Sequence, residues 1–425
     1  MNTRHSILVL LCGMLLNSPL DAEDWPQFRG PNRDAAWNES GTLEVFPSEG
    51  LKVRWRATIG PGFSSPVVAQ GRVYITDCRL EKPTAEERVL CFDEKSGQPL
   101  WNHHYFVAYP EWAFDPNGGG PRATPIVQDG RIYTLGAMGH LFCLDAVSGK
   151  VVWEKDLARD YGVKEFTGIT ASPLIDNDLL ILYMCGKPDA CVVAFQKTTG
   201  QEVWRALDDA FSYSSPLVIT SGGARQLIVW TQDGVTSLHP GTGKIHWREE
   251  FRTPGDQIVS SPVFLNHRLL IGGLMFKLDD KEPRASILWP ELKPVAKRIL
   301  CDTCTALLQG DYIYSGKSSG ALVCLEADTG REIWSTSAVT AAGHGASMHL
   351  TPNGDSVLIF TDEGQLIRAR LSPKGYEELT RSPLIKPTYS FGGRLVVWPP
   401  PAYANRQVFV RNDLEMICAS LASDP

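Results

Sequence analysis

The sequence predicts an all-β fold: an eight-bladed β-propeller of four-stranded antiparallel blades, closed by strands from both termini. Three observations predict it. A tryptophan recurs at intervals of 42 to 52 residues, the period of propellers with four-stranded blades. Five of these tryptophans follow a glycine by four residues, and helical periodicity is nowhere sustained. The eight repeat positions are Trp55, Trp101, Trp153, Trp204, Trp247, Trp289, Trp334 and Leu379.

Each complete repeat consists of an apolar strand, a polar turn that ends in Ser-Gly or Thr-Gly, and a strand that reaches the tryptophan. A hairpin with a type I turn needs a residue at positive φ, and glycine adopts that conformation without steric cost. The indole is suited to wedge between one sheet and the next. Two copies are degenerate, because Trp289 lacks the glycine and the copy from Gly375 ends in Leu379. The glycines of the complete copies are Gly97, Gly149, Gly200, Gly243 and Gly330.

A second marker opens the repeats. It is a pair of small residues, the second with a hydroxyl, followed by a proline and an apolar strand, as in Ser64-Ser65-Pro66. Further copies begin at Ala123, Ala171, Ser214 and Ser260, and the copies at Cys304 and Ala346 have lost the proline. We place the eighth copy near Gly393. The first strand of each blade lines the axis, where eight strands converge, so we interpret these residues as packing residues.

The two ends of the chain complete the last blade. After Leu379 the chain has room for three strands, which we predict at Leu395–Trp398, Val408–Arg411 and Met416–Leu421. The missing outer strand is then supplied by Leu51–Thr58, which carries Trp55. Closing the ring in this way removes the exposed sheet edges.

Length and charge agree with one large domain. A closed repeat lets 425 residues bury one continuous core. The net charge of -7 is mild, and no basic stripe or Lys/Arg block occurs. These features argue against nucleic acid or an anionic membrane as the main partner.

The N-terminus predicts export. Arg4 precedes the apolar run Ile7–Leu16, and Ala22 offers a small residue for cleavage, so residues 1–22 are predicted to be a signal peptide. Residues 23–50 would form an N-terminal extension and residues 51–425 the propeller. The apolar run is too short to span a bilayer, so we expect a secreted or periplasmic protein without a transmembrane segment. Cys12 leaves a lipid anchor as the less favoured alternative, because Leu11 stands where a lipidation site prefers Gly or Ala.

Eight of the ten cysteines fall into three groups. Cys185 and Cys191 flank a turn between two predicted strands, where an oxidising compartment would let them form a disulfide. Cys301 and Cys304 form a C-x-x-C without the histidine of a haem site, which favours a local disulfide or two thiols over redox catalysis. Four others occupy the same place in different blades and are interpreted as small core residues: Cys91, Cys143, Cys324 and Cys418.

A family resemblance follows from these motifs. The repeated Asp-x-x-Thr/Ser-Gly-x-x-x-Trp, the Ser-Ser-Pro starts and the opening Asp24-Trp-Pro-Gln-Phe-Arg-Gly-Pro31 resemble secreted bacterial proteins of the pyrroloquinoline-quinone-like β-propeller repeat superfamily. The resemblance covers the chain from about Trp25 to its end. The superfamily includes quinoprotein alcohol dehydrogenases and the cofactor-free propeller lipoprotein of the outer-membrane barrel assembly machinery. Fold alone does not choose between them.

Departures from the dehydrogenase pattern favour a protein without catalytic activity. Dehydrogenases of this type carry two adjacent cysteines whose disulfide stacks on the quinone, and this sequence has no Cys-Cys dipeptide. Its blades are too short for the insertions that build a calcium-assisted quinone site, and no C-x-x-C-H marks a cytochrome. No His-Glu-x-x-His motif or P-loop occurs. We therefore expect no cofactor and no metal.

Two regions are candidates for binding. The residues that precede the inner strands face an axial funnel, and the candidate ligand-binding residues there are Arg122, Thr170, Tyr213, Gln257, Asp302 and His344. The connection His103–Pro121 is the longest between blades, and its candidate recognition residues are Phe106, Tyr109, Trp112 and Phe114. Aromatic residues on a long loop above a rigid scaffold favour recognition of a partner. In the alternative, they fold back and cap the first blades.

These observations predict a noncatalytic binding or scaffold platform for a protein or an extended polymer such as a polysaccharide. The alternative is an oxidoreductase that binds a quinone or another cofactor in the axial funnel. An accessory protein of glycan processing stays open as a third class. The sequence does not name the ligand.

Overall fold

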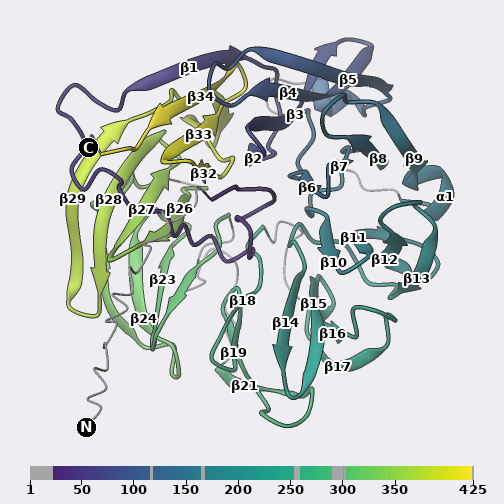
Figure 1. Cartoon of the computed structure of the whole chain (residues 1–425). Helices are drawn as coiled ribbons and strands as arrows, with labels where there is room; N and C mark the ends of the chain where they lie inside the picture. The colour runs from purple at the N-terminus through teal and green to yellow at the C-terminus, as the bar shows by residue number, and fades with distance from the viewer. Residues whose placement is uncertain are drawn as a thin grey trace, which may run out of the picture.

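The chain forms a ring of eight four-stranded antiparallel sheets in the computed structural model (Figure 1). The structure describes residues 23–114, 118–163, 168–252, 259–289, 300, 303–343 and 345–423. The predicted eight-bladed propeller is confirmed. Helix is limited to α1 (Leu157–Tyr161) and the 3-10 turn Glu111–Phe114 in the described part of the chain, and no helix there is long and apolar enough to cross a bilayer.

Within blades 1 to 4 the strands follow chain order from the axis outward. They are β2 (Val67–Ala69), β3 (Arg72–Glu81), β4 (Thr84–Asp93) and β5 (Pro99–Val107); β6 (Ile126–Gln128), β7 (Arg131–Leu135), β8 (His140–Asp145) and β9 (Val151–Asp156); β10 (Leu174–Asp176), β11 (Leu179–Gly186), β12 (Ala190–Gln196) and β13 (Glu202–Ala206); β14 (Leu217–Ser221), β15 (Ala224–Thr231), β16 (Gly234–Leu238) and β17 (Ile245–Glu250).

Blades 5 to 7 repeat this order, and blade 8 takes its outer strand from the N-terminal side of the chain. The strands are β18 (Val263–Leu265), β19 (Arg268–Ile271), β20 (Leu274–Leu278) and β21 (Ala285–Trp289); β22 (Leu307–Gln309), β23 (Tyr312–Gly316), β24 (Leu322–Glu326) and β25 (Glu332–Thr336); β26 (Met348–Asn353), β27 (Ser356–Thr361), β28 (Gln365–Ser372) and β29 (Gly375–Pro383); β32 (Ala402–Ala404), β33 (Gln407–Arg411), β34 (Glu415–Ser420) and β1 (Val53–Thr58).

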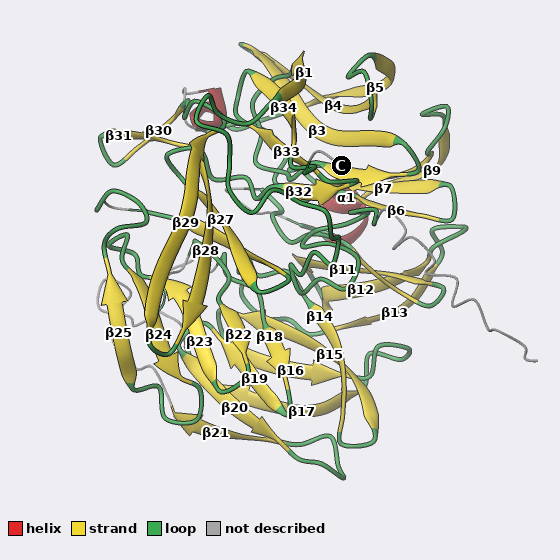
Figure 2. Cartoon of the chain, turned by 60° about the vertical axis from the view of Figure 1, so that its left-hand side comes forward, coloured by secondary structure: helices red, strands yellow, loops and turns green. Residues whose placement is uncertain are grey.

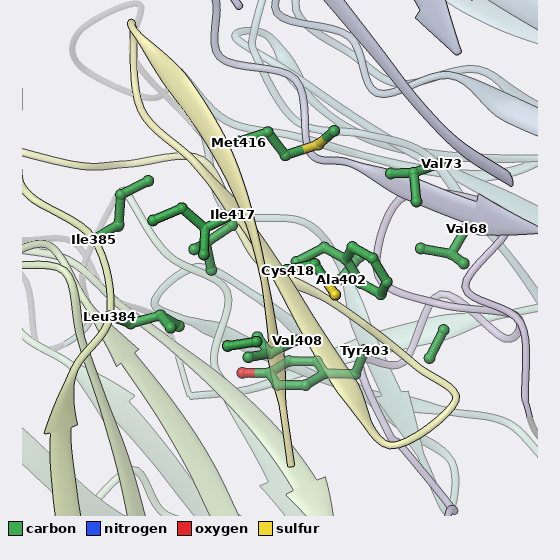
Figure 3. Packing of buried hydrophobic residues seen from close by; sticks show 14 of the residues in the cluster. Val68, Val73, Leu384, Ile385, Ala402, Tyr403, Val408, Met416, Ile417 and Cys418 are labelled. Carbon is green, nitrogen blue, oxygen red and sulfur yellow. The ribbon is translucent and has the colours of Figure 1, made fainter. Parts of the chain in front are cut away.

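The ring closes through blade 8, as the sequence predicts. Strand β1 pairs antiparallel with β34, and Trp55 lies opposite Cys418. Figure 1 shows this join where the purple start of the chain lies beside its yellow end. Buried side chains of blades 8 and 1 pack together in one hydrophobic cluster at this join, among them Ile417, Val408 and Val68 (Figure 3).

The prediction for the inner strand of blade 8 is wrong. Residues from Leu395 to Trp398 do not line the axis, because β31 (Arg394–Val396) pairs only with β30 (Tyr389–Phe391) in a separate hairpin (Figure 2). The true inner strand, β32, follows three consecutive prolines that end at Pro401. In blade 1 the marker proline Pro66 likewise stands directly before β2. The eighth copy of the marker therefore lies at Pro401 and not near Gly393, and a run of prolines excludes a strand there because proline cannot donate to a ladder.

The repeat glycine and the repeat tryptophan meet across the junction between neighbouring blades. A Cβ on Gly243 would lie 2.5 Å from the ring of Trp204, which belongs to the preceding blade. Gly243 has φ +70°, so this position favours glycine for two reasons: the left-handed backbone and the absence of a side chain that would collide with the indole. The Trp204 Nε1–H donates to Pro240 O at 2.9 Å in the same turn. The other contacting pairs are Trp55 with Gly97, Trp101 with Gly149, Trp153 with Gly200 and Trp289 with Gly330.

A second set of contacts joins the blades near the axis. The hydroxyl of the residue before the marker proline accepts a hydrogen bond from the corresponding backbone N–H of the preceding blade. Ser65 N donates to Thr124 Oγ1, Thr124 N to Ser172 Oγ, and Ser172 N to Ser215 Oγ, at 2.9 to 3.0 Å. Ser65 Oγ itself has no hydrogen-bond partner among the described residues. The matching residue of blade 8 is Pro400, which has no N–H to give.

The N-terminal residues 24–39, here called the axial strap, cross the ring (Figure 1). Trp25 exchanges two backbone hydrogen bonds with Val68 of β2, and Trp37 N donates to Pro352 O of β26. Glu39 accepts from Asn405 N at the β32–β33 turn. Because these contacts lie in or just beyond the inner strands, the strap covers the face opposite to the one where those strands begin.

The strap is held by buried side chains. Trp25 and Trp37 are fully buried and both contact the ring of Tyr403, at centroid distances of 5.7 and 5.3 Å. Arg33 reaches into the axis and donates to Pro173 O of blade 3 at 2.8 Å. Burial lowers the pKa of Arg33 to about 9. The strap therefore links blades that lie far apart in the ring.

Candidate functional site

The candidate site is the face on which the inner strands begin, here called the funnel face. Antiparallel order within each blade places on this face every connection that leads to an inner strand. It also carries the turns between the second and third strands. The site is therefore assembled from loops of many blades on a fixed ring.

Arg122 lies on the connection that leads to β6, in the described part of the funnel. Its Cζ stands 4.7 Å from the ring centroid of Phe63, and its Nη2 donates to Gly118 O at 3.1 Å. Burial lowers the pKa of Arg122, while the charges of Tyr213 and Tyr389 oppose that shift. The guanidinium group is thus oriented by an aromatic face and by the long connection between blades 1 and 2.

Of the other five predicted funnel residues, the structure describes two. Tyr213 packs edge-on against Phe211 at 5.1 Å. Thr170 has a buried Oγ1 without a hydrogen-bond partner among the described residues. The remaining three candidates lie outside the described residues: Gln257, Asp302 and His344. The structure thus places Arg122, Thr170 and Tyr213 on connections that lead to three successive inner strands.

An aromatic rim on this face was missed from the sequence. Tyr389 of the β30–β31 hairpin packs edge-on against Phe63 at 5.1 Å, and Trp398 lies 5.2 Å from Tyr389. Phe391 also contacts Trp398, with their ring centroids 4.6 Å apart. The sequence prediction put Trp398 in an inner strand at 395–398 and gave no role to Tyr389 and Phe391. The proline run 399–401 was the signal that could have located them.

The residues of the predicted recognition loop differ in their exposure: one is exposed to solvent, and another folds back onto the propeller. Phe106 is 74% exposed at the end of β5. Tyr109 instead turns inward, and its hydroxyl donates to Glu87 Oε1. Phe114 is half-buried, and the side chain of Trp112 lies outside the described residues.

Glu87 is the anchor of this loop. It is fully buried and accepts hydrogen bonds from Tyr105 Oη at 2.5 Å, from Tyr109, and from Ala137 N at 3.0 Å. A Cβ at Gly136 would lie 2.2 Å from Glu87 Oε2, so only glycine fits beside the carboxylate. Burial raises the pKa of Glu87, and the three hydrogen bonds act against that shift.

A second buried charge network holds the entry to blade 1. Arg88 donates two hydrogen bonds to Asp77, whose Oδ2 also accepts from Gly60 N at 2.5 Å. Arg411 of blade 8 donates to Gly60 O and Thr76 O at 2.6 and 2.8 Å. These contacts fix the seam between the first and last blades directly under the funnel face.

Two further motifs have local roles in turns. Gly316-Lys-Ser-Ser-Gly320 has the spacing of a nucleophile elbow, yet it lies in the turn between β23 and β24, and no helix follows it. Cys185 and Cys191 lie opposite each other at the end of the β11–β12 hairpin, with their sulfurs 3.6 Å apart as thiols. Their predicted disulfide stays a prediction.

The described residues do not assemble the full set that a calcium-assisted quinone needs. Arg122 and the rim offer a cation and aromatic faces. Among the residues that the structure describes, however, no group of three or more His, Cys, Asp or Glu side chains is placed to hold a metal ion. We derive no chemical step through a quinone.

The fold and the repeat define the class of this protein. The chain forms eight four-stranded blades, and a Gly–Trp contact joins the blades at five of the junctions. Together with the family match that follows, this makes it a propeller of the pyrroloquinoline-quinone-like repeat superfamily. The family model of the outer membrane protein assembly factor BamB matches residues 85–274 and 281–374, more than half of the chain. The chain belongs to this family.

Individual relatives come from two functional groups. Outer membrane protein assembly factor BamB of Shewanella oneidensis is 21% identical over 336 residues, which cover 76% of this chain and 68% of that protein. Quinoprotein alcohol dehydrogenase PedH of Pseudomonas putida is 27% identical over 149 residues, 32% of this chain. The match spans 25% of the dehydrogenase's own length.

Solved structures show the same fold. Quinohemoprotein alcohol dehydrogenase from Comamonas testosteroni superposes with a TM-score of 0.66 at 13% identity, covering 95% of this chain and 81% of that one. BamB from Moraxella catarrhalis superposes with a TM-score of 0.58 at 15% identity, covering 87% of this chain and 98% of that one. At these identities the likeness shows the fold alone.

Proposed function

We propose that this protein is a secreted or periplasmic, noncatalytic scaffold whose funnel face binds a protein partner. Membership in the family of an outer membrane protein assembly factor supports a role in protein assembly. The match to BamB extends over most of this chain, whereas the match to PedH is confined to about a third of it. The comparisons favour a protein partner and lend no support to a polysaccharide.

The observation that carries the proposal is the exposure of large apolar side chains on the funnel face. Phe106 is 74%, Leu395 58% and Leu414 64% exposed. Leu395 belongs to the β30–β31 hairpin and Leu414 to the β33–β34 turn, and these segments are tied together by Thr388 Oγ1, which donates to Asp413 Oδ2 at 2.7 Å. Exposed apolar anchors on a rigid support are typical of protein-binding surfaces.

A photo-crosslinking amino acid placed in turn at Phe106, Leu395 and Leu414 tests this proposal in the living cell. Val203 is the matched control, since it is apolar and 49% exposed but lies at the start of the outer strand β13, away from the funnel face, whereas Phe106 lies at the end of the outer strand β5. We expect the three funnel-face positions to crosslink to the same protein and Val203 to crosslink to none. Equal crosslinking at Val203, or no crosslink at the three positions, would contradict the proposal.

One specific observation favours the alternative function, an oxidoreductase. Arg122 is held against Phe63 in the funnel, and arginine is a natural partner of a carboxylate-rich quinone. The dehydrogenase relatives give this alternative its chemistry. Direct titration with the quinone separates the two functions.

A further inference from the structure

The funnel-face corner of blade 3 carries two cysteines that the scaffold function leaves unused. Cys185 ends the apolar part of β11 and Cys191 begins β12, on either side of the paired residues Gly186 and Ala190. Their sulfurs lie 3.6 Å apart, and the two side chains are 7% and 0% exposed. A disulfide bond joins sulfurs at about 2.05 Å between facing residues of this kind. The two thiols are thus positioned to react with each other.

This corner supports the loop that carries Tyr213. Cys191 N donates to Leu207 O at 2.9 Å, at the start of that loop. The Tyr183 hydroxyl accepts from Ser212 N at 2.7 Å, one residue before Tyr213. On the other side, Lys187 N donates to Tyr161 O of helix α1 at 2.8 Å. A bond across the hairpin end would therefore fix one wall of the funnel.

We propose that Cys185 and Cys191 form an intramolecular disulfide that cross-links the β11–β12 hairpin and stiffens the adjoining 207–213 loop. The two thiols lose two protons and two electrons, and a small-molecule or protein disulfide accepts them. With glutathione disulfide, one cysteine thiolate attacks a glutathione sulfur and expels the first glutathione thiolate. The second cysteine thiolate then attacks the protein sulfur of this mixed disulfide and expels the second. Two molecules of glutathione thiol are the balancing product.

The burial of the pair sets when the bond forms. The hydrogen bond with the Cys185 sulfur and burial raise the pKa of Cys191 well above its usual range. The thiolate is the reactive form, and each unit of raised pKa lowers its fraction about tenfold. Because both side chains are also buried in the folded protein, an oxidant reaches them more easily before the hairpin has folded, so we expect the folded thiol form to react more slowly.

Alkylation of the full-length protein tests the proposal. The protein is prepared once in a compartment or buffer with glutathione disulfide present during folding and once under reduction, then unfolded in iodoacetamide and weighed. After oxidative folding we expect a linked peptide pair that contains Cys185 and Cys191, and two fewer alkyl groups on the peptides that carry these two cysteines. Adding glutathione disulfide to the folded, reduced protein should remove those two groups at least about tenfold more slowly. Equal alkylation of Cys185 and Cys191 in both preparations, or a link from either of them to another cysteine, would overturn the proposal.

Variants and an exchange measurement complete the test. In Cys185→Ser, Cys191 should be alkylated equally in both preparations, whereas in the control Cys91→Ser the Cys185 and Cys191 peptides should still lose two alkyl groups on oxidation, because Cys91 lies in blade 1. Amide hydrogen exchange of residues 207–213 should be slower in the oxidised wild type than in the reduced wild type. Unchanged exchange there would refute the stiffening. If Cys185→Ser fails to fold, the wild-type alkylation count and peptide link still decide. None of these readouts depends on the partner of the scaffold.

Discussion

The junctions between blades and the funnel face are built in different ways. At five junctions a glycine of one blade packs on the tryptophan of the preceding blade. On the funnel face, outside the repeated hydroxyl contacts at the starts of the inner strands, the described side chains are held by partners that differ from blade to blade: Tyr109 by Glu87, Arg122 by Phe63. Local repeats thus stabilise the ring, whereas contacts between distant segments shape the surface that we propose binds a partner.

One junction shows what the repeat contributes. Blade 5 has no glycine in its last turn, and the tryptophan of blade 4 changes its partner accordingly. Trp247 Nε1 donates to Gln226 Oε1 of its own blade at 2.7 Å instead of to a carbonyl of the next blade. The glycine and the tryptophan are therefore one structural unit, shared between neighbouring blades.

Opening the ring should have the largest effect. Deleting residues 51–58 removes β1 and Trp55 and leaves β34 as an unpaired edge. We expect the truncated protein to unfold without cooperativity and to aggregate. Circular dichroism during heating measures the first effect, and light scattering measures the second. A truncated protein that melts like the full-length chain would contradict the closure.

Removing a tryptophan should compare a complete junction with the incomplete one. Trp204 is buried and contacts the next blade, so Trp204→Ala should cost roughly 3 to 5 kcal/mol in the free energy of unfolding. Trp247→Ala should cost at least about 1 kcal/mol less, because its hydrogen bond stays within its own blade. Urea denaturation measures both values. Equal losses would mean that the glycine contact adds nothing.

Two glycines with the same backbone isolate the contact itself. Gly243 and Gly130 both have φ +70°, but a Cβ at Gly130 meets nothing within 4 Å. Alanine at either site should cost about 1 to 2 kcal/mol for the left-handed backbone. Gly243→Ala should cost about 1 to 3 kcal/mol more, because its methyl group collides with Trp204. Equal losses of unfolding free energy for the two variants in urea denaturation would show that the contact between Gly243 and Trp204 does not restrict the side chain at position 243.

On the funnel face, Glu87 should make the stability depend on pH. Because burial raises its pKa, the folded state binds this proton more tightly than the unfolded chain does. Its stabilising contribution is present below the ordinary value of about 4.3 and is lost as pH rises through the raised value. From about pH 4 to about pH 7, the wild type should therefore lose stability relative to Glu87→Gln.

The neighbouring Glu86 is the control for this prediction. The hydrogen bond with His104 lowers the pKa of Glu86, so its contribution is present at neutral pH and is lost as pH falls. Relative to Glu86→Gln, the wild type should gain stability as pH rises through the lowered pKa of Glu86 up to the ordinary value of about 4.3, just below the range in which Glu87 acts. The two variants should thus give slopes of opposite sign in urea denaturation, and slopes of the same sign would contradict the assignment of Glu87.

The sequence was sufficient for the ring because its contacts come from a regular period. Trp55, Trp204 and Gly243 could be placed in blades before any coordinates were known. The funnel face could not be built in this way, because Tyr109 and Glu87 meet only through the path of an irregular loop. Arg33 contacts Pro173, 140 residues further along the chain, and no local pattern predicts such a contact.

The most direct test of the scaffold account is calorimetric titration of the full-length protein with pyrroloquinoline quinone and calcium, followed by a dye-linked alcohol oxidation assay. The account predicts neither saturable binding nor turnover. Saturable binding that Arg122→Ala abolishes, together with turnover, would contradict the account and establish the funnel as a dehydrogenase site.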